Sequence, residues 1–442
     1  MGVRTEIRLS EVVTALSHAL DITEGQPIGH AERCCRIGMR LGEALDLPSA
    51  SRSALFYALL LKDAGCSSTA SHVAALFEND DQRVKVDLKT TDLQRPLEAI
   101  RYAARNAAPE RNPLVRVRRF ALVALKGSRR EITQLRCERG AQIARQIGLT
   151  EETAQAILHL DEHWDGAGDP ARVQGPAIPL LGRILCLAQS AEIAWQRGGP
   201  DAAIEVARRR RGTWFDPQLV DLLTALRDDH AFWAQVRLAD VSDLEPEDRA
   251  EVADEARLDR IAEAFASVID AKSPFTSQHS QGVADIAGRV AQQLDLPASE
   301  RRDLRRAGLL HDIGKLGVSS RILDKPGPLS DSEWVAMRRH PEMTQRILEH
   351  VSAFGPLAET AAAHHERLDG RGYHRGVHAD ELPLAARILA VADVAEALGA
   401  DRPYRPALAP EEVLTLMREE VGSHFCPVAY EALEGAMSAN GI

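Results

Sequence analysis

Several features are scarce or missing in this sequence of 442 residues, and each absence narrows the possible class of protein. Aromatic residues make up only 4%, whereas alanine, leucine, arginine and glutamate abound, which favours helices over strands. The six cysteines form no Cys-x-x-Cys pair, so we expect free thiols in a reducing cytosol. No apolar run approaches the roughly 18 residues of a membrane span, and the amino terminus shows no signal-peptide pattern. We therefore expect a helical, cytoplasmic protein that does not bind membranes.

An excess of basic residues is also missing, since the formal charge is −11. Nucleic-acid polymers and anionic membranes select clustered lysine and arginine, so neither is an expected partner. The basic runs at 116–119 and 208–211 are interpreted as solvated helix faces. The length exceeds what one hydrophobic core usually serves, which predicts two or three domains.

An internal repeat organises the chain. Residues 26–50 resemble residues 276–300, including the segment LDLP, and both intervals from His30 to Lys62 and from His279 to His311 span 32 residues. KDAG (62–65) therefore corresponds to HDIG (311–314). Residues 175–189 match residues 379–393 at a different offset, so the first copy carries about 45 extra residues between Cys66 and Arg136.

These patterns predict an all-α fold with two tandem helical domains of one type. We expect a first domain over 1–235 and a second over 259–442, joined by a connecting helix over 236–258. The linking segment is rich in charge and lacks turn residues after Pro246. The apolar spacing of Leu258, Ile261 and Phe265 predicts that its helix continues into the second domain.

Candidate metal ligands gather in the second copy. A lone histidine on an apolar helix is usually a core residue, but most of the equivalent positions in the first copy carry other residues. Adjacent helical residues point about 100° apart, so the pairs 311–312 and 364–365 fit two ions better than one, with Asp312 as the bridge. Imidazole with carboxylate suits iron, manganese or zinc and does not choose among them. The seven donors are His279, His311, Asp312, His340, His364, His365 and Asp393.

Such a pair of ions activates water near neutral pH and screens the charge of a phosphate diester. Lys315 lies four residues after His311, on the same predicted face, where its ammonium could contact a phosphoryl oxygen. The expected reaction is hydrolysis of a P–O bond, with Asp312 and Lys315 as the catalytic residues.

The motifs in residues 259–430 resemble the HD-GYP subfamily of the HD phosphohydrolases. They are HDIGK (311–315), the KPG loop (325–327), His340, HHERLDGRGY (364–373), ARILAVAD (386–393) and DRPYR (401–405). The resemblance implies an all-helical domain that hydrolyses cyclic di-GMP to pGpG or GMP with two divalent transition metals, typically iron or manganese. It makes the seven donors metal ligands and Lys315 a contact to the scissile phosphate. Arg402 and Arg405 would hold the other phosphate, and Tyr373 would lie beside the nucleotide.

Some positions depart from the subfamily pattern. Phe275 stands where some members carry a carboxylate for a third ion, which favours two metals. His374 replaces the proline of the Gly-Tyr-Pro motif, Thr344 replaces a usual glycine, and Cys426 interrupts a usual Phe-Asp-Pro. These changes affect the expected loop geometry and substrate preference, and none removes a ligand.

The first copy keeps His30 and Asp63 but loses the rest of the ligand set. Lys62, Arg136, Leu160, Asp161 and Gln189 stand where the second copy has His311, His340, His364, His365 and Asp393. Charge repulsion from Lys62 and Arg136 should exclude divalent ions. We expect a regulatory or dimerisation domain, which would make the protein a homodimer.

Two alternative functions remain open at this point. An HD phosphohydrolase acting on another nucleotide is permitted by the ligand set but disfavoured by HHERLDGRGY (364–373). A non-catalytic protein that senses a nucleotide or binds a partner is disfavoured by the complete ligand set but permitted by the altered Gly-Tyr-His loop.

Overall fold

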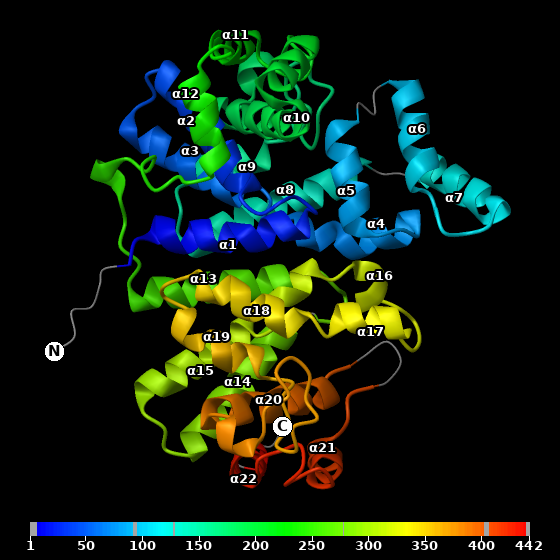
Figure 1. Cartoon of the computed structure of the whole chain (residues 1–442), viewed down its shortest axis with the longest axis vertical. Coiled ribbons are helices and arrows are strands. Elements are labelled where there is room, and N and C mark those ends of the chain that lie inside the picture. The colour runs from blue at the N-terminus through cyan, green and yellow to red at the C-terminus, as the bar shows by residue number, and fades with distance from the viewer. Residues whose placement is uncertain (1–6, 92–94, 127–128, 277, 402–405, 439–442) are drawn as a thin grey trace. The chain divides into compact units, whose positions relative to one another are not determined.

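The computed structural model describes residues 7–91, 95–126, 129–276, 278–401 and 406–438. Within these ranges the regular structure is helical, with isolated backbone bridges in place of strands. The all-α prediction is therefore confirmed. The chain divides into two compact units, residues 1–257 and 258–442 (Figure 1). None of the described helices combines the length and the hydropathy that a membrane crossing requires.

The first unit brings together helices from distant parts of the sequence. α2 contacts both α3 and α10, and α9 contacts α3, α8 and α10. The α-helices are α1 (Leu9–Thr23), α2 (His30–Ala44), α3 (Ser49–Leu61), α4 (Ala70–Phe77), α5 (Asp81–Thr90), α6 (Pro96–Asn106), α7 (Pro113–Lys126), α8 (Arg129–Ile147), α9 (Glu151–Leu158), α10 (Leu180–Arg209), α11 (Pro217–Ala225) and α12 (His230–Leu238). Short 3-10 helices are η1 (Cys66–Thr69), η2 (Gly175–Ala177) and η3 (Glu247–Arg249).

The second unit packs α14 against α15, α20 and α22, and α18 against α19 and η4. Its first helix, α13 (Glu255–Asp270), contains the predicted apolar stripe, because Leu258, Ile261 and Phe265 are all buried. The other α-helices are α14 (His279–Gln293), α15 (Ala298–Leu310), α16 (Ser320–Leu323), α17 (Asp331–Met337), α18 (His340–Glu349), α19 (Gly355–Ala362), α20 (Leu384–Gly399), α21 (Pro410–Arg418) and α22 (Pro427–Ser438). The 3-10 helices are η4 (Ile313–Gly317) and η5 (Ala379–Glu381).

The repeat seen in the sequence is also a repeat of structure. α2 and α14 each have 15 residues, and α3 and α15 each have 13. The residue before each histidine, Gly29 or Gln278, has a left-handed backbone conformation. The helices α4 to α7 of the first unit occupy most of the inserted residues, and Figure 1 shows them on one side of that unit.

The predicted connecting helix over 236–258 is wrong. α12 ends at Leu238, Ala239 has a left-handed backbone, and the following residues up to Asp254 contain only η3 in regular helical form. Glu245 accepts hydrogen bonds from Ser10 Oγ at 2.6 Å and Tyr57 Oη at 2.5 Å. A charged side chain of this segment thus forms hydrogen bonds with distant residues of the first unit. These long-range contacts favour a non-helical backbone although the local sequence has a helical pattern.

Candidate metal centre

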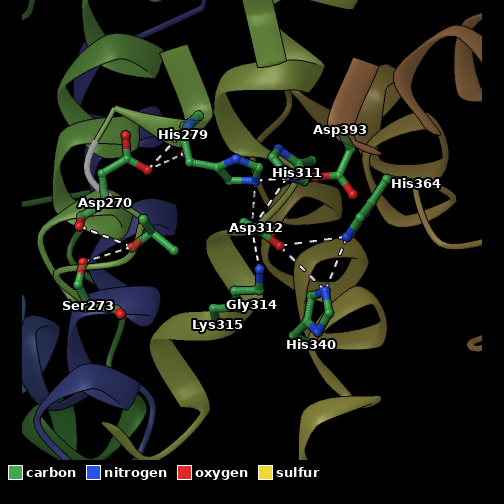
Figure 2. A network of polar contacts seen from close by, with 12 residues as sticks. Asp270, Ser273, His279, His311, Asp312, Gly314, Lys315, His340, His364 and Asp393 are labelled. Atoms are coloured by element: carbon green, nitrogen blue, oxygen red, sulfur yellow. Dashed lines mark hydrogen bonds and ion pairs between the residues drawn. The ribbon is translucent and has the colours of Figure 1, made fainter. Parts of the chain in front are cut away.

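Helix ends of the second unit carry most of the predicted ligands. His279 and His340 are the first residues of α14 and α18. The pair His311–Asp312 follows α15 directly, and the pair 364–365 follows α19. Asp393 lies within α20. Because these ends converge, the structure brings all seven predicted donors into one cluster. Figure 2 labels all of them except His365.

Asp312 lies at the centre of this cluster and is 1% exposed. Its Oδ1 atom is 3.4 Å from His340 Nε2 and 3.6 Å from His364 Nε2. Its Oδ2 atom is 3.4 Å from His311 Nε2 and 3.7 Å from His279 Nε2. The two oxygens therefore face two different pairs of histidines, as Figure 2 shows. With this arrangement, Asp312 would be able to contribute one oxygen to each of two ions.

The remaining donors complete the two groups. Asp393 Oδ1 lies 3.2 Å from His279 Nε2 and 3.7 Å from His311 Nε2. On the other side, His340, His364 and His365 each offer a ring nitrogen, and these atoms lie within 4.8 Å of one another. One ion would thus be held by residues 279, 311, 312 and 393, and the other by residues 312, 340, 364 and 365.

Three histidines are oriented by the backbone just before them. In each, Nδ1 donates to the carbonyl three residues upstream, at 2.7 Å for His311, 2.7 Å for His340 and 2.6 Å for His364. A neutral imidazole with a protonated Nδ1 has a lone pair on Nε2, which is the form that binds a metal. All three Nε2 atoms consequently face the cluster as acceptors.

These acceptors fit a bound cation. His340 Nε2 and His364 Nε2 lie 3.1 Å apart, although neither can donate to the other in this tautomer. His311 Nε2 and Asp312 Oδ1 are buried without a hydrogen-bond partner among the described residues. Buried acceptors without donors are costly. Divalent transition metals in this cluster would remove that cost, and imidazole and carboxylate are suitable ligands for them.

Burial and charged neighbours shift the pKa values of the cluster in different directions. Burial lowers the pKa of His340 to about 3 and of His365 to about 4, so both are neutral near pH 7. Burial alone would also lower the pKa of His279, but hydrogen bonds to Asp393 and Glu396 raise it to about 10. Burial alone would raise the pKa of Asp312, whereas Lys315 and His311 hold it well below its usual range.

Glu396 is a functional candidate that the sequence reasoning missed. Its Oε2 atom accepts a hydrogen bond from His279 Nδ1, so it orients that ring and leaves Nε2 for the cluster. The available signal was its spacing, since it follows Asp393 by three residues on α20 and so shares its helix face.

A cavity of about 830 Å³ opens beside the cluster, and His340 and His365 form part of its wall. Lys315 also lines it, with Nζ 2.5 Å from Asp312 Oδ2. Tyr373 is a further wall residue, and its ring centroid is 4.6 Å from that of His365. Lys315 and Tyr373 therefore both lie on the cavity wall, and their contacts to a substrate stay predictions. The predicted phosphate contacts Arg402 and Arg405 lie outside the described residues.

The structure shows the surroundings of each residue that departs from the subfamily pattern. Thr344 Oγ1 donates to the His311 carbonyl at 2.8 Å and accepts from Gly314 N at 3.0 Å, so it supports the turn that carries the ligands. A Cβ atom at Gly314 would lie 2.0 Å from the His340 carbonyl, which explains the glycine. His374 Nε2 is 2.8 Å from Gln345 Oε1. Phe275 lines the cavity, and Cys426 is a buried free cysteine.

The equivalent place in the first unit is filled with cations from the chain itself. Asp63, the counterpart of Asp312, binds Lys62 Nζ through Oδ2 and Lys89 Nζ through Oδ1, the latter at 3.1 Å. Lys89 comes from α5, in the inserted residues, and also contacts Glu24 at 2.9 Å. Arg136 pairs with Asp161. The cavity here measures about 110 Å³, so it is much smaller than the one beside Asp312.

Two groups of donor atoms in the first unit have metal-like spacing, namely 24, 63 and 66, and 30, 34 and 192. Both already bind cationic side chains. Lys89 contacts Glu24 and Asp63, and Arg33 Nε donates to Glu192 Oε1 at 2.6 Å. A divalent ion would have to displace these cations, so the second unit holds the better candidate centre.

An all-helical unit whose helix ends converge on buried histidines and aspartates defines a domain of the HD type. The HD domain family model matches residues 123–219 and 263–428. The chain belongs to this family.

Curated relatives place the chain more closely. It is 41% identical to the 3′3′-cGAMP-specific phosphodiesterase 3 of Vibrio cholerae over 97% of this chain and 95% of that protein. A crystal structure of a cyclic GMP-AMP-specific phosphodiesterase of V. cholerae has 38% sequence identity and a TM-score of 0.66, with 98% of each chain covered. A cyclic di-GMP phosphodiesterase of Pseudomonas aeruginosa is 40% identical over 37% of this chain and 39% of that protein. The resemblance to the HD-GYP subfamily is therefore confirmed.

Proposed function

We propose that the protein is a metal-dependent phosphodiesterase that hydrolyses a cyclic dinucleotide. The observation that carries this proposal is Asp312, whose two oxygens face two separate histidine pairs beside a cavity of about 830 Å³. A cavity of this size is in the range of sites for small-molecule ligands.

Different residues of the centre would bind the metals, contact the phosphate and orient a ligand. The seven donors would hold two divalent transition metals, of which iron and manganese are our first candidates and zinc is another. When bound, these ions supply a nucleophile from water and stabilise the charge of the transferred phosphoryl group. Lys315 would donate to a phosphoryl oxygen from the cavity wall. Tyr373 would pack beside the nucleotide, and Glu396 would keep the His279 ring in its metal-binding orientation.

The substrate proposed first is 3′3′-cGAMP, with cyclic di-GMP as the second candidate. The relative named for 3′3′-cGAMP matches both units of this chain, whereas the cyclic di-GMP phosphodiesterase from P. aeruginosa matches little more than one third of it. Addition of water to one phosphodiester would break one P–O bond and release a linear dinucleotide. With cyclic di-GMP this product is pGpG, and a second hydrolysis gives GMP.

The test is turnover by protein reconstituted with Fe(II) or Mn(II) in the absence of air. Hydrolysis of 3′3′-cGAMP and cyclic di-GMP is followed by chromatography, with Asp312→Ala as the inactive control. We expect a higher kcat/KM for 3′3′-cGAMP. Metal-loaded protein that hydrolyses neither compound would contradict the proposal and would favour another nucleotide or a non-catalytic role.

For the first unit we propose a regulatory or dimerisation role, with a homodimer as the expected assembly in the cytoplasm. The filled site around Lys89 and Asp63 supports a role without metal chemistry. Removal of residues 1–257 should change the turnover rate or the oligomeric state, measured by light scattering. A shortened protein unchanged in both would contradict this role.

A further inference from the structure

Two aromatic rings in the wall of the cavity beside the metal centre contact the same arginine. The guanidinium carbon of Arg338 lies 5.5 Å from the ring centroid of Trp334 and 5.5 Å from that of Tyr373. Both rings line the cavity. Trp334 is 42% exposed, which is unusual for so large an apolar side chain. Arg338 immediately follows the end of α17, so this short helix brings Arg338 beside Trp334 of the cavity wall.

The rings constrain Arg338 without using its donors. Aromatic contacts engage the flat face of a guanidinium by cation–π attraction. The N–H groups lie in the guanidinium plane and stay available for a bidentate contact. Among the described residues, no carboxylate lies within ion-pair distance of Arg338, whereas Arg346, Arg367 and Arg375 of the same unit each have one. Arg338 is thus a positioned cation with free hydrogen-bond donors.

Among the described residues, the cations that line the cavity are Lys315 and Lys325, and both are already engaged. Lys315 Nζ pairs with Asp312, and Lys325 Nζ pairs with Glu333. A cyclic dinucleotide carries two phosphodiesters, and only one of them can lie at the metal centre during cleavage. The second one enters a cavity that must also stabilise its charge. A planar arginine matches the oxygens of a phosphate better than a lysine does.

We propose that Arg338 binds the phosphodiester that is not being cleaved, held in position by Trp334 and Tyr373. This inference rests on the proposed function and adds Arg338 to the two arginines, 402 and 405, that the subfamily resemblance predicts at the same phosphate. Arg338 belongs to none of the motifs that identify the domain. Its ring contacts are with Trp334 and Tyr373, and neither of these residues is a proposed metal ligand.

The experiment compares Arg338→Ala with Arg339→Ala in the metal-loaded full chain. Arg339 is the adjacent residue, is also exposed, and has no ring contact among those described for this region, so its removal changes the net charge equally. Each variant is assayed on 3′3′-cGAMP, cyclic di-GMP and bis(4-nitrophenyl) phosphate, which has a single phosphate. Metal content and melting temperature are measured for every variant.

We expect Arg338→Ala to raise KM for the cyclic dinucleotides by about 10- to 100-fold, the loss typical of one charge-assisted contact. Its kcat should change by less than about threefold, and its rate on bis(4-nitrophenyl) phosphate should match that of the wild type. Arg338→Lys should recover part of the loss, since it keeps the charge without the planar fork. Arg339→Ala should behave as the wild type, and all variants should keep their metal and melting temperature.

The outcomes separate this inference from the proposed function. If the wild type hydrolyses a cyclic dinucleotide and Arg338→Ala has the KM of Arg339→Ala, only the role of Arg338 is overturned. An equal loss on bis(4-nitrophenyl) phosphate, or a loss of metal, would show that Arg338 supports the centre and does not bind the second phosphate. A wild type that hydrolyses no cyclic dinucleotide would overturn both.

Discussion

The two units keep the same histidine–glutamate pair in opposite electrostatic settings. His279 Nδ1 bonds Glu396 in the second unit, and at the equivalent position His30 Nδ1 bonds Glu192 at 2.5 Å. The pKa of His279 is raised to about 10 in spite of burial, because Asp393 and Glu396 are close. Burial and Lys62 lower the pKa of His30 to about 4. The pair itself belongs to the fold, and its neighbours decide whether the site attracts cations.

The central aspartates extend this comparison. Asp312 faces the Nε2 atoms of four histidines, whereas Asp63 faces the ammonium groups of Lys62 and Lys89. Each aspartate is buried, so each needs positive charge nearby. The first unit takes that charge from its own lysines, and the second has the donors to take it from metal ions. Where the first unit lacks the metal ligands, a lysine of the inserted helix α5 thus supplies part of the positive charge that its buried aspartate needs.

The strongest test of this comparison is to remove the equivalent aspartates separately. Asp312→Ala should release the metals and lower kcat by more than about a thousandfold, because the bridging ligand is lost. Asp63→Ala should leave the metal content unchanged but destabilise the chain by about 3–5 kcal/mol, since two buried ammonium groups lose their partner. Elemental analysis, turnover and urea unfolding measure these effects. Equal metal loss in both variants would show that the first unit also holds metal.

Lys315 marks the next difference, since Cys66 stands at its position in the first unit. Lys315→Ala should lower kcat by roughly 10- to 1000-fold, the range for loss of one transition-state contact. Its metal content should stay near that of the wild type, because Lys315 is not a ligand. Steady-state kinetics and elemental analysis on the same preparation give the result. An unchanged rate would assign Lys315 to a purely electrostatic role beside Asp312.

Acid should destabilise the first unit through His30. Its pKa is about 4 in the folded state, against 6.5 for an ordinary histidine, so the unfolded state binds more protons between these values. Stability is therefore present above pH 6.5 and is lost as the pH falls towards 4, by about 3 kcal/mol. His30→Gln should remove this part of the pH dependence, as measured by urea unfolding across that range. Parallel curves for the two proteins would show that His30 does not titrate in this way.

The smallest effect concerns the shared pair. Glu396→Gln should weaken metal affinity by about 10- to 100-fold, because His279 loses the carboxylate that orients it. Glu192→Gln, at the equivalent place, should leave metal affinity unchanged. Competition with a chelator measures both affinities. The comparison fails if Glu192→Gln weakens metal binding as much as Glu396→Gln does.

The helical fold and the cluster could be predicted because both follow from local patterns and from the repeat. The offset between the copies aligned α2 with α14 and α3 with α15, and the motifs marked all seven donors. The two oxygens of Asp312 face separate pairs of histidines. That Asp312 bridges two ions stays a prediction.

Other features depend on contacts between distant residues and have no local signal. The segment over 236–258 has a helical pattern, yet its Glu245 binds Ser10 and Tyr57. The prediction placed Lys62 and Arg136 in the first site but not Lys89, because nothing in the inserted residues indicates that α5 faces Asp63. The sequence alone likewise does not distinguish Arg338 from the adjacent Arg339, because the contacts of Arg338 with two aromatic rings appear only in the structure.

The way the histidines are oriented has a consequence for how the centre can vary among related sequences. A backbone carbonyl cannot be removed by a point mutation, so the ring orientations of His311, His340 and His364 are largely insulated from changes in the side chains upstream. His279 alone depends on a replaceable side chain, that of Glu396, among these four histidines. Related sequences that keep these helices should therefore keep most of the ligand geometry. Substitution of the one residue at position 396 could still change their metal affinity.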